Sequence, residues 1–177
     1  IPVITSWVAG ALIWKWVLSP EYGAINNILA LFGIEGPSWL QSSKWAMPAI
    51  VLASVWKDMG YFGLMLMSGL QGINQEYYDA AAIDGAGKIK QFTRITLPLL
   101  TPTLFFVLII SLINSFQLFT QIMIMTPDGG PLGSTMVMVE RIYKCGFRYY
   151  EMGTAAAYSW ILFAILLLLT MVQMKLQ

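Results

Sequence analysis

Two long stretches of the sequence carry no charged side chain, and they restrict the possible folds more than any other feature. One lies between Arg94 and Asp128, and the other lies between Glu151 and Lys175. A helix of about 20 mostly apolar residues crosses the hydrocarbon core of a membrane. Inside lipid every backbone polar group needs an internal partner, so only helices and closed barrels can span it. The two-residue alternation typical of barrel strands is absent from both stretches, so the sequence predicts transmembrane helices.

The composition agrees with a membrane protein. Of the 177 residues, 58% are hydrophobic and 11% are charged, whereas a soluble domain has about 25% charged residues. The net charge of +1 gives no sign of a nucleic-acid partner. The sequence has no histidine and a single cysteine, Cys145, which excludes an internal disulfide, catalysis by histidine and a His/Cys metal site. We therefore expect no catalytic residue, no metal ligand and no nucleic-acid partner.

The apolar pattern predicts an all-α, polytopic bundle with four spans in one domain, residues 1–177. The spans lie at residues 1–18, 45–73, 99–125 and 152–174. The first span is marginal in length and lacks the basic region that begins a signal peptide. We therefore expect a domain truncated at its N-terminus, with further spans upstream.

Two polar loops join the last three predicted spans, at residues 74–98 and 126–151. Each loop has three basic residues, so the positive-inside rule does not decide which loop faces the cytoplasm. The second loop begins with a cluster of turn residues at 126–131 and continues into an expected helix at 135–143. In that helix we expect Glu140 and Arg141 to lie on a solvated surface, with contact to a binding protein as the alternative.

The first of these loops contains a spaced motif. Asp79, Ala80 and Ala81 are followed after three residues by Gly85, and nine residues later come Ile95, one further residue and Leu97-Pro98. This run resembles the cytoplasmic loop of ABC importer permeases, in which the pattern begins Glu-Ala-Ala. A chance match of six fixed positions has a probability of order 10⁻⁷ per start site. The departure is Asp79, which keeps the charge of the family's Glu with one methylene less.

Further residues are similar to the sugar-importing branch of that family. They are Asp84, Ala86, Phe92 and the turn Gly129-Gly130-Pro131. With them the resemblance covers nearly the whole chain. It is closest to binding-protein-dependent carbohydrate permeases of the maltose and glycerol-phosphate type.

The resemblance implies a permease subunit of an ATP-driven importer of a sugar or oligosaccharide, in the inner (plasma) membrane of a bacterium or archaeon. No GxxxxGK[ST] phosphate-binding loop occurs in the sequence, so energy must come from separate ATPase subunits. ATP and Mg would bind there, and this chain would hold no cofactor and catalyse no reaction. The other implied partners are a second permease subunit, an extracytoplasmic sugar-binding protein, the lipid bilayer and the carbohydrate itself.

Elementary chemistry gives loop 74–98 a shape that suits docking. Residues 80–82 are alanines, which favour helix and allow close approach, and Gly85 and Gly87 permit a turn with positive φ. Pro98 begins the next span, where its missing N–H costs little. We expect a short helix, a turn and a second short helix across the membrane face; the alternative is a plain amphipathic loop. The expected contacts to the ATPase are Asp79, Ala80, Ala81, Asp84, Gly85, Ala86, Ile95, Leu97 and Pro98.

A polar stripe on the third span is the candidate substrate path. Ser111, Asn114, Gln117 and Gln121 fall within an arc of about 120° on a continuous helix. Amides in lipid are costly and offer both donors and acceptors, as sugar hydroxyls require. Hydrogen bonding between helices is the alternative reading. In sugar permeases that this chain resembles, the same helix lines the cavity.

An ionisable pair in the second span adds three candidates for the path. Lys57 and Asp58 lie near its middle, and Tyr61 follows one turn later. A central charge costs about 2.5–3.5 kcal/mol to insert, so the pair marks the path, the mouth of a cavity or a contact with a partner subunit. A transporter driven by an ion gradient, or a channel, is the competing function. It predicts paired intramembrane carboxylates or an inverted repeat, and only Asp58 is present.

Overall fold

The structure is a computed structural model that describes residues 2–175. In this part of the chain all regular elements are helical and no strand occurs. The α-helices are α1 (Trp7–Val17), α2 (Ala24–Leu31), α3 (Ala46–Gln71), α4 (Glu76–Ile83), α5 (Lys88–Gln91), α6 (Leu97–Phe116), α7 (Thr120–Met125), α8 (Met138–Tyr143) and α9 (Met152–Lys175). Two π-helical segments, Phe92–Thr96 and Lys144–Arg148, and two single 3₁₀ turns, Pro127–Gly129 and Pro131–Gly133, complete the set.

Three helical runs are long and apolar enough to cross a membrane. They are Ala46–Gln71, Lys88–Met125 and Met152–Lys175, which correspond to the last three predicted spans. The predicted first span, whose residue 1 lies outside the described part, forms only the 11-residue helix α1. At 1.5 Å per residue α1 is about 16 Å long, about half of what a span needs.

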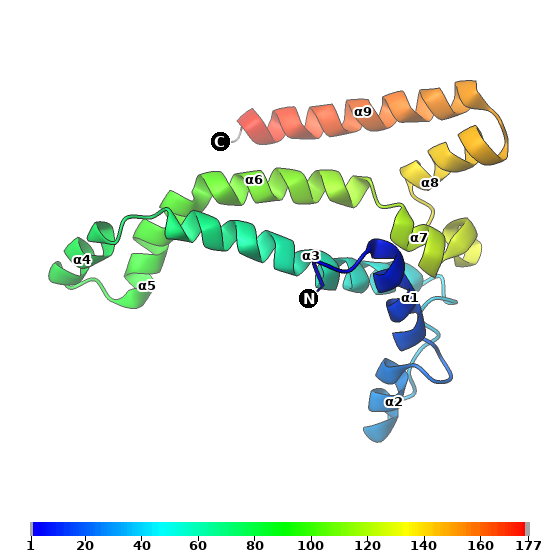
Figure 1. The fold of residues 1–177 in the computed structure, drawn as a ribbon, viewed down its shortest axis with the longest axis horizontal. Coiled ribbons are helices and arrows are strands. Elements are labelled where there is room, and N and C mark those ends of the chain that lie inside the picture. The colour runs from blue at the N-terminus through cyan, green and yellow to red at the C-terminus, as the bar shows by residue number, and fades with distance from the viewer. Residues whose placement is uncertain (1, 176–177) are drawn as a thin grey trace.

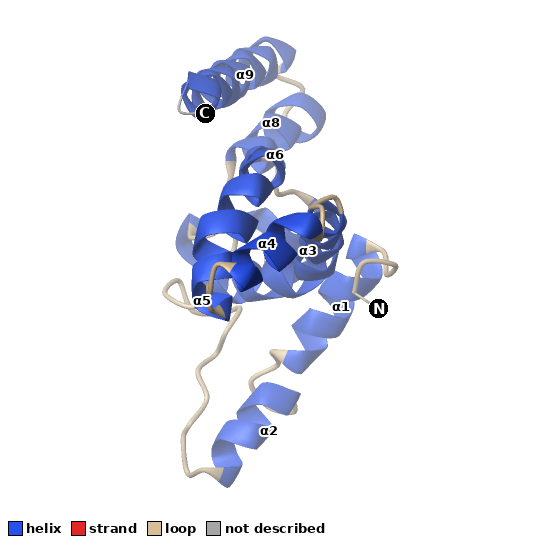
Figure 2. Ribbon diagram, turned by 90° about the vertical axis from the view of Figure 1, so that its left-hand side faces the viewer, coloured by secondary structure: helices blue, strands red, loops and turns tan. Residues whose placement is uncertain are grey.

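The long helices α3, α6 and α9 lie side by side along the long axis of the molecule (Figure 1). Loop 74–98, with α4 and α5, lies at one end of them, and loop 126–151 lies at the other end. Because α9 runs back toward α4, the C-terminal end of the described chain is on the α4 side. Figure 2 looks onto that side, with α4 and α5 in front and α2 projecting away from α9. We call the two regions the α4 end and the α7 end.

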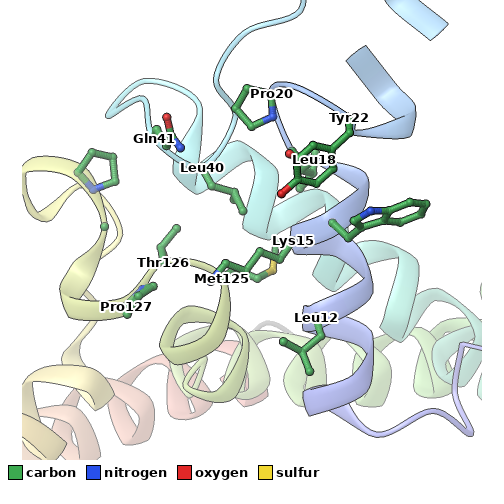
Figure 3. Close-up of a pocket in the computed structure, with 14 residues that line it drawn as sticks. Leu12, Lys15, Leu18, Pro20, Tyr22, Leu40, Gln41, Met125, Thr126 and Pro127 are labelled. Atoms are coloured by element: carbon green, nitrogen blue, oxygen red, sulfur yellow. The ribbon is translucent and has the colours of Figure 1, made fainter. Parts of the chain in front are cut away.

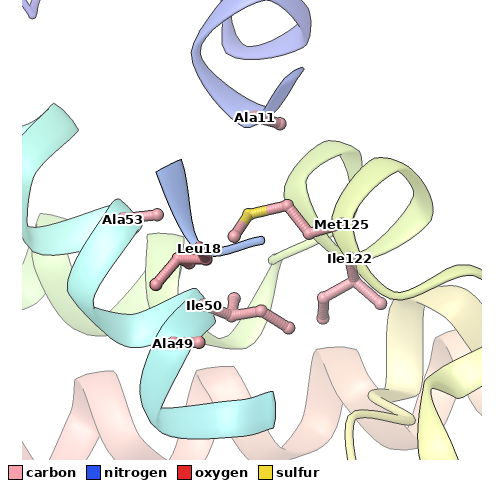
Figure 4. Close-up of a cluster of buried hydrophobic side chains, with 7 residues drawn as sticks. All are labelled: Ala11, Leu18, Ala49, Ile50, Ala53, Ile122 and Met125. Carbon is pink, nitrogen blue, oxygen red and sulfur yellow. The ribbon is translucent and has the colours of Figure 1, made fainter. Parts of the chain in front are cut away.

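The buried apolar core belongs to the α7 end. It joins α1, α3 and α7 through side chains that are almost completely buried (Figure 4): Ala11, Leu18, Ala49, Ile50, Ala53, Ile122 and Met125. Three of the seven are alanines, which let helix backbones approach closely where apolar burial alone gives little driving force in lipid. The core therefore fixes α1 and the short α7 against the first half of α3.

Toward the α4 end, α3 and α6 approach each other at a glycine. A Cβ added to Gly69 on α3 would lie 2.6 Å from Thr103 Oγ1 and 2.8 Å from Leu100 Cδ1 on α6. Both distances are too short for real atoms, so the helix pair is this close because Gly69 has no side chain.

Candidate coupling loop and transport cavity

Helix α4 is formed by local interactions rather than by packing. The Asn74 side chain accepts a hydrogen bond from Glu76 N at 3.1 Å and so satisfies one of the free N–H groups at the helix start. Gln75 Nε2 donates to Asp79 Oδ1 at 3.3 Å. No residue of α4 is buried, so Asp79, Ala80 and Ala82 face away from the rest of the chain.

The turn after α4 confirms the expectation for Gly85 and corrects the one for Gly87. Gly85 has φ +75°, its N–H donates to Ala82 O at 3.0 Å and the N–H of Ala86 donates to Ala81 O at 2.8 Å. This pair of bonds is a Schellman motif, which ends a helix with a left-handed residue. Gly87 has φ −67° and ψ 165°, so it is extended and caps α5 without needing the freedom of glycine.

The expected second helix is not separate from the next span. Helix α5 continues through the π-helical segment Phe92–Thr96 into α6, and Figure 1 shows α5 turned away from the α6 axis. The N–H of Leu97 donates to Phe92 O, and Pro98 has no N–H to offer Arg94 O. This local change of register lets the helical run bend.

Two hydrogen bonds join α4 and its turn to the helical run that begins with α5. Tyr78 Oη and Thr96 Oγ1 are 2.9 Å apart, and Gln91 Nε2 donates to Ala86 O at 3.1 Å. Thr96 and Gln91 are both buried, and both bonds are partly shielded from water. Of the nine predicted contact residues, six lie on α4 and its turn, whereas Ile95, Leu97 and Pro98 lie in the bend behind them.

The α4 end also exposes apolar side chains. Ile83 is 88% exposed and Ile89 is 82% exposed, and they flank the Gly85 turn. Tyr77 and Phe92 are each more than half exposed. This surface thus combines a carboxylate, small residues and two isoleucines, with no cover from the described chain.

The predicted polar stripe does not lie on one continuous helix. The third span breaks after α6 at residues 117–119, where Phe119 has φ −140° and ψ −63°, and resumes as α7. The predicted arc of about 120° assumed a continuous helix from Ser111 to Gln121, and this prediction is wrong because the helix is interrupted. The break itself nevertheless brings Asn114, Gln117 and Gln121 to one cavity.

That cavity has a volume of about 250 Å³. Its lining comes from the N-terminus of α1, the middle of α3 and the break between α6 and α7: Trp7, Asp58, Asn114, Gln117, Leu118, Phe119, Thr120 and Gln121. Four of the seven predicted path residues are among them. We call it the break cavity. Trp7 escaped the sequence analysis, because an aromatic residue in an apolar segment carries no signal of its own.

The other three candidates do not line the break cavity. Lys57 is 8% exposed, its Nζ donates to Val3 O at 3.1 Å and lies 5.8 Å from the centroid of the Trp7 ring. Ser111 Oγ donates to Leu108 O within its own helix at 3.0 Å. The Tyr61 ring lies beside Phe62, with 5.6 Å between centroids.

The α7 end holds an ionic network around Glu140, and the expected solvated surface is confirmed for Arg141, which is exposed, and is wrong for Glu140. Glu140 is fully buried rather than solvated, and its Oε1 lies 3.0 Å from Lys144 Nζ, four residues further on. Lys144 Nζ is also 3.6 Å from Asp128 Oδ1, which accepts a hydrogen bond from Arg148. The i,i+4 spacing of Glu140 and Lys144 was the available signal. The Arg148 guanidinium, with help from Lys144, holds the pKa of the Asp128 carboxyl below its usual range.

A second, larger hollow of about 720 Å³ opens between α1 and the turn at residues 126–131 (Figure 3). Its labelled lining includes Leu12, Leu18, Met125 and Thr126. Lys15 reaches across it, and its Nζ donates to Ile124 O at 3.3 Å. None of the predicted path residues lines this hollow, so it does not enter the case for a transport path.

Comparison with known proteins agrees with this architecture. Residues 2–176 match the family described as binding-protein-dependent transport system inner membrane component. The sulfoquinovosyl glycerol transport system permease protein of Agrobacterium fabrum is 38% identical over 164 residues, which are 93% of this chain and 53% of that protein. The sn-glycerol-3-phosphate transport system permease protein of Shigella flexneri is 35% identical over 175 residues, 99% of this chain and 59% of that protein.

Solved structures give the same result. A chain of a bacterial ABC transporter involved in the import of the acidic polysaccharide alginate superimposes with a TM-score of 0.88 and 25% identity, covering 99% of this chain and 61% of that one. The chain thus spans little more than half the length of its relatives. By its helical order, its motif and this match, the chain belongs to the inner-membrane permease family of binding-protein-dependent transport systems.

Proposed function

We propose that this chain is part of the permease subunit of an ATP-driven, binding-protein-dependent importer of a sugar or oligosaccharide. The observation that carries the proposal is the pairing of two features along one helical run. The exposed α4 turn lies at one end of the run, and the break cavity lies at the other.

Coupling to ATP would pass through that run. A separate ATPase subunit would hold α4 and the Gly85 turn, move with its own ATP and Mg, and pull on the Tyr78–Thr96 and Gln91–Ala86 bonds. Helix α6 has 20 residues, about 30 Å, so it would transmit this movement to Asn114 and the break. The chain itself would bind no cofactor and catalyse no reaction.

The break cavity suits a hydroxyl-rich solute. Asn114, Gln117 and Gln121 offer amide donors and acceptors, Asp58 offers acceptors and Trp7 offers an apolar ring. The names of the relatives give different cargoes: sulfoquinovosyl glycerol, glycerol phosphate and alginate. We therefore infer the class of the transported solute from the residues that line the cavity. A sugar-binding protein and a second permease would complete the importer. The alginate transporter has been solved in complex with a periplasmic protein that binds an alginate pentasaccharide.

The test is uptake by the assembled transporter carrying Asn114→Ala or Gln117→Ala. We expect each substitution to reduce uptake about tenfold, the effect of one lost hydrogen bond to substrate of about 1.4 kcal/mol, while the ATPase subunit still co-purifies. The matched control is Ser115→Ala, because Ser115 bonds Ser111 O on its own helix and does not line the cavity. Wild-type uptake by both cavity variants would refute this path.

An ion-gradient transporter is the second candidate, because Asp58 places an ionisable group in the cavity. The two mechanisms differ in their energy source. Uptake into vesicles that requires internal ATP and survives a protonophore supports the importer, whereas uptake abolished by the protonophore alone supports the gradient.

A further inference from the structure

One side chain sets the charge of the break cavity. Of the described residues that line it, Asp58 alone carries a charge, and the polar remainder are the neutral side chains of Asn114, Gln117, Thr120 and Gln121. Asp58 is half-buried on α3. The cavity therefore presents one carboxylate among neutral amides and a hydroxyl group.

The neighbouring lysine attracts the Asp58 carboxylate but does not line the cavity. Successive residues of a helix point about 100° apart, and Lys57 is buried on another side of α3. Its ammonium is held by Val3 O at 3.1 Å and lies against the Trp7 ring. Asp58 and Trp7 line the cavity and Lys57 does not, so a solute in the cavity can contact the Asp58 carboxylate but not the Lys57 ammonium.

Amides cannot select a solute by charge, because each offers donors and an acceptor to any partner. A carboxylate can. It accepts hydrogen bonds from hydroxyl or ammonium groups, and it repels phosphate, sulfonate or uronate groups, more strongly where little water screens the charges. Discrimination by charge in this cavity thus depends on Asp58.

We infer that Asp58 is a specificity-determining residue, which makes the break cavity favour neutral, hydroxyl-rich or cationic solutes over anionic ones. The inference rests on the proposed function, since it assumes that the solute passes through this cavity. The inference restricts the range of transported solutes more than the names of the relatives suggest, because phosphorylated and acidic sugars would be disfavoured.

The first experiment measures the charge of the cavity without knowledge of the cargo. Thr120, which lines the cavity, is partly exposed and is not one of the proposed substrate-binding amides, is replaced by cysteine in the assembled transporter. The rates of its reaction with trimethylammonioethyl and sulfonatoethyl methanethiosulfonate are compared. Cys145 is 5% exposed, so the unsubstituted protein serves as the blank. We expect Asp58→Asn to lower the cation-to-anion rate ratio about tenfold, and Glu35→Gln, an exposed charge elsewhere, to leave it unchanged.

The second experiment uses three sugars that differ in charge: glucosamine, glucose and glucose 6-phosphate. Protection of the introduced cysteine by each sugar is measured in the protein that retains Asp58 and in the Asp58→Asn variant. We expect the phosphate to protect least when Asp58 is present and to gain most, about tenfold, from Asp58→Asn.

The outcomes separate the two proposals. A rate ratio unaffected by Asp58→Asn, or a phosphate that protects as well as glucose in the protein that retains Asp58, overturns the inference. If the ratio falls as expected but no sugar protects the cysteine and none is taken up, the charge assignment holds and the proposed function fails.

Discussion

The two ends of the helical bundle are built in opposite ways. At the α7 end, α1, α3 and α7 bury a shared apolar core, and a carboxylate with no exposed surface is paired with a lysine. At the α4 end, helix α4 buries none of its residues, and Ile83 on α4 and Ile89 on α5 are both more than 80% exposed. We call the α7 end closed, because its side chains pack against one another, and the α4 end open, because its helix and apolar side chains are exposed.

The contrast explains how an open end can still have a defined shape. Helix α4 is held by an Asn cap, a Schellman turn and the Tyr78–Thr96 bond, all of which need only nearby residues or the next helix. A surface that is ordered before binding loses little entropy on docking. The α4 end is thus ordered before any docking, as the proposed function requires, whereas the α7 end stabilises the bundle.

The largest expected effect is all-or-none and concerns the sidedness of the ends. We expect a cysteine at Leu132, which is 97% exposed at the α7 end, to react with an impermeant maleimide in intact cells. A cysteine at Lys88, at the α4 end, should react only after permeabilisation. Labelling of the Lys88 cysteine in intact cells would reverse the predicted topology and refute the proposed docking of an ATPase at the α4 end.

The next effect concerns stability at the closed end. Glu140→Ala leaves Lys144 buried with only Asp128, 3.6 Å away, as a partner. Breaking a buried pair costs about 3–5 kcal/mol, and the remaining carboxylate leads us to expect about 3 kcal/mol. Thermal unfolding of the purified protein in detergent measures it. The control Glu21→Ala removes an exposed carboxylate and should change stability by no more than about 0.5 kcal/mol.

A smaller change in stability, with a specific loss of function, is expected at the open end. Gly85→Val places a branched side chain at φ +75°, with strain of about 1–2 kcal/mol. The turn should distort, so the ATPase subunit should no longer co-purify, while the spans still insert. Gly87→Val is the matched control, because Gly87 is extended and has the same open surroundings. Equal ATPase retention by both variants would refute the role of the turn.

The smallest effect concerns the exposed ion pair beside the closed end. The folded pKa of Asp128 is lowered by Arg148, so its charge stabilises the fold above its unfolded pKa of 3.8. That contribution disappears as the pH falls from 3.8 through the lower folded value. Asp128→Asn should therefore lower the melting temperature slightly at about pH 6, and the difference should shrink as the pH falls below 3.8. A difference that grows toward low pH would contradict the assignment.

Some features of this protein follow from the sequence alone. Uncharged stretches of span length must be helical in lipid, whatever packs around them, and the α6 run and α9 lie where those stretches lie. The α4 helix and its turn are equally local. Alanines, a glycine at φ +75° and hydrogen bonds over five residues or fewer determine them, so the spacing of the motif was sufficient.

Other features depended on contacts between segments distant in the sequence. The break at residues 117–119 leaves Leu118 packed against the α1–α3–α7 core, and no Pro or Gly marks it. The neighbours of Lys57 are Val3 and Trp7, which lie about 50 residues earlier. Hydropathy and periodicity report how apolar a segment is and which residues share its face. Only the tertiary structure decided that Asp58 meets Gln117 in a cavity while Lys57 is turned from it, because those positions depend on which helices pack together.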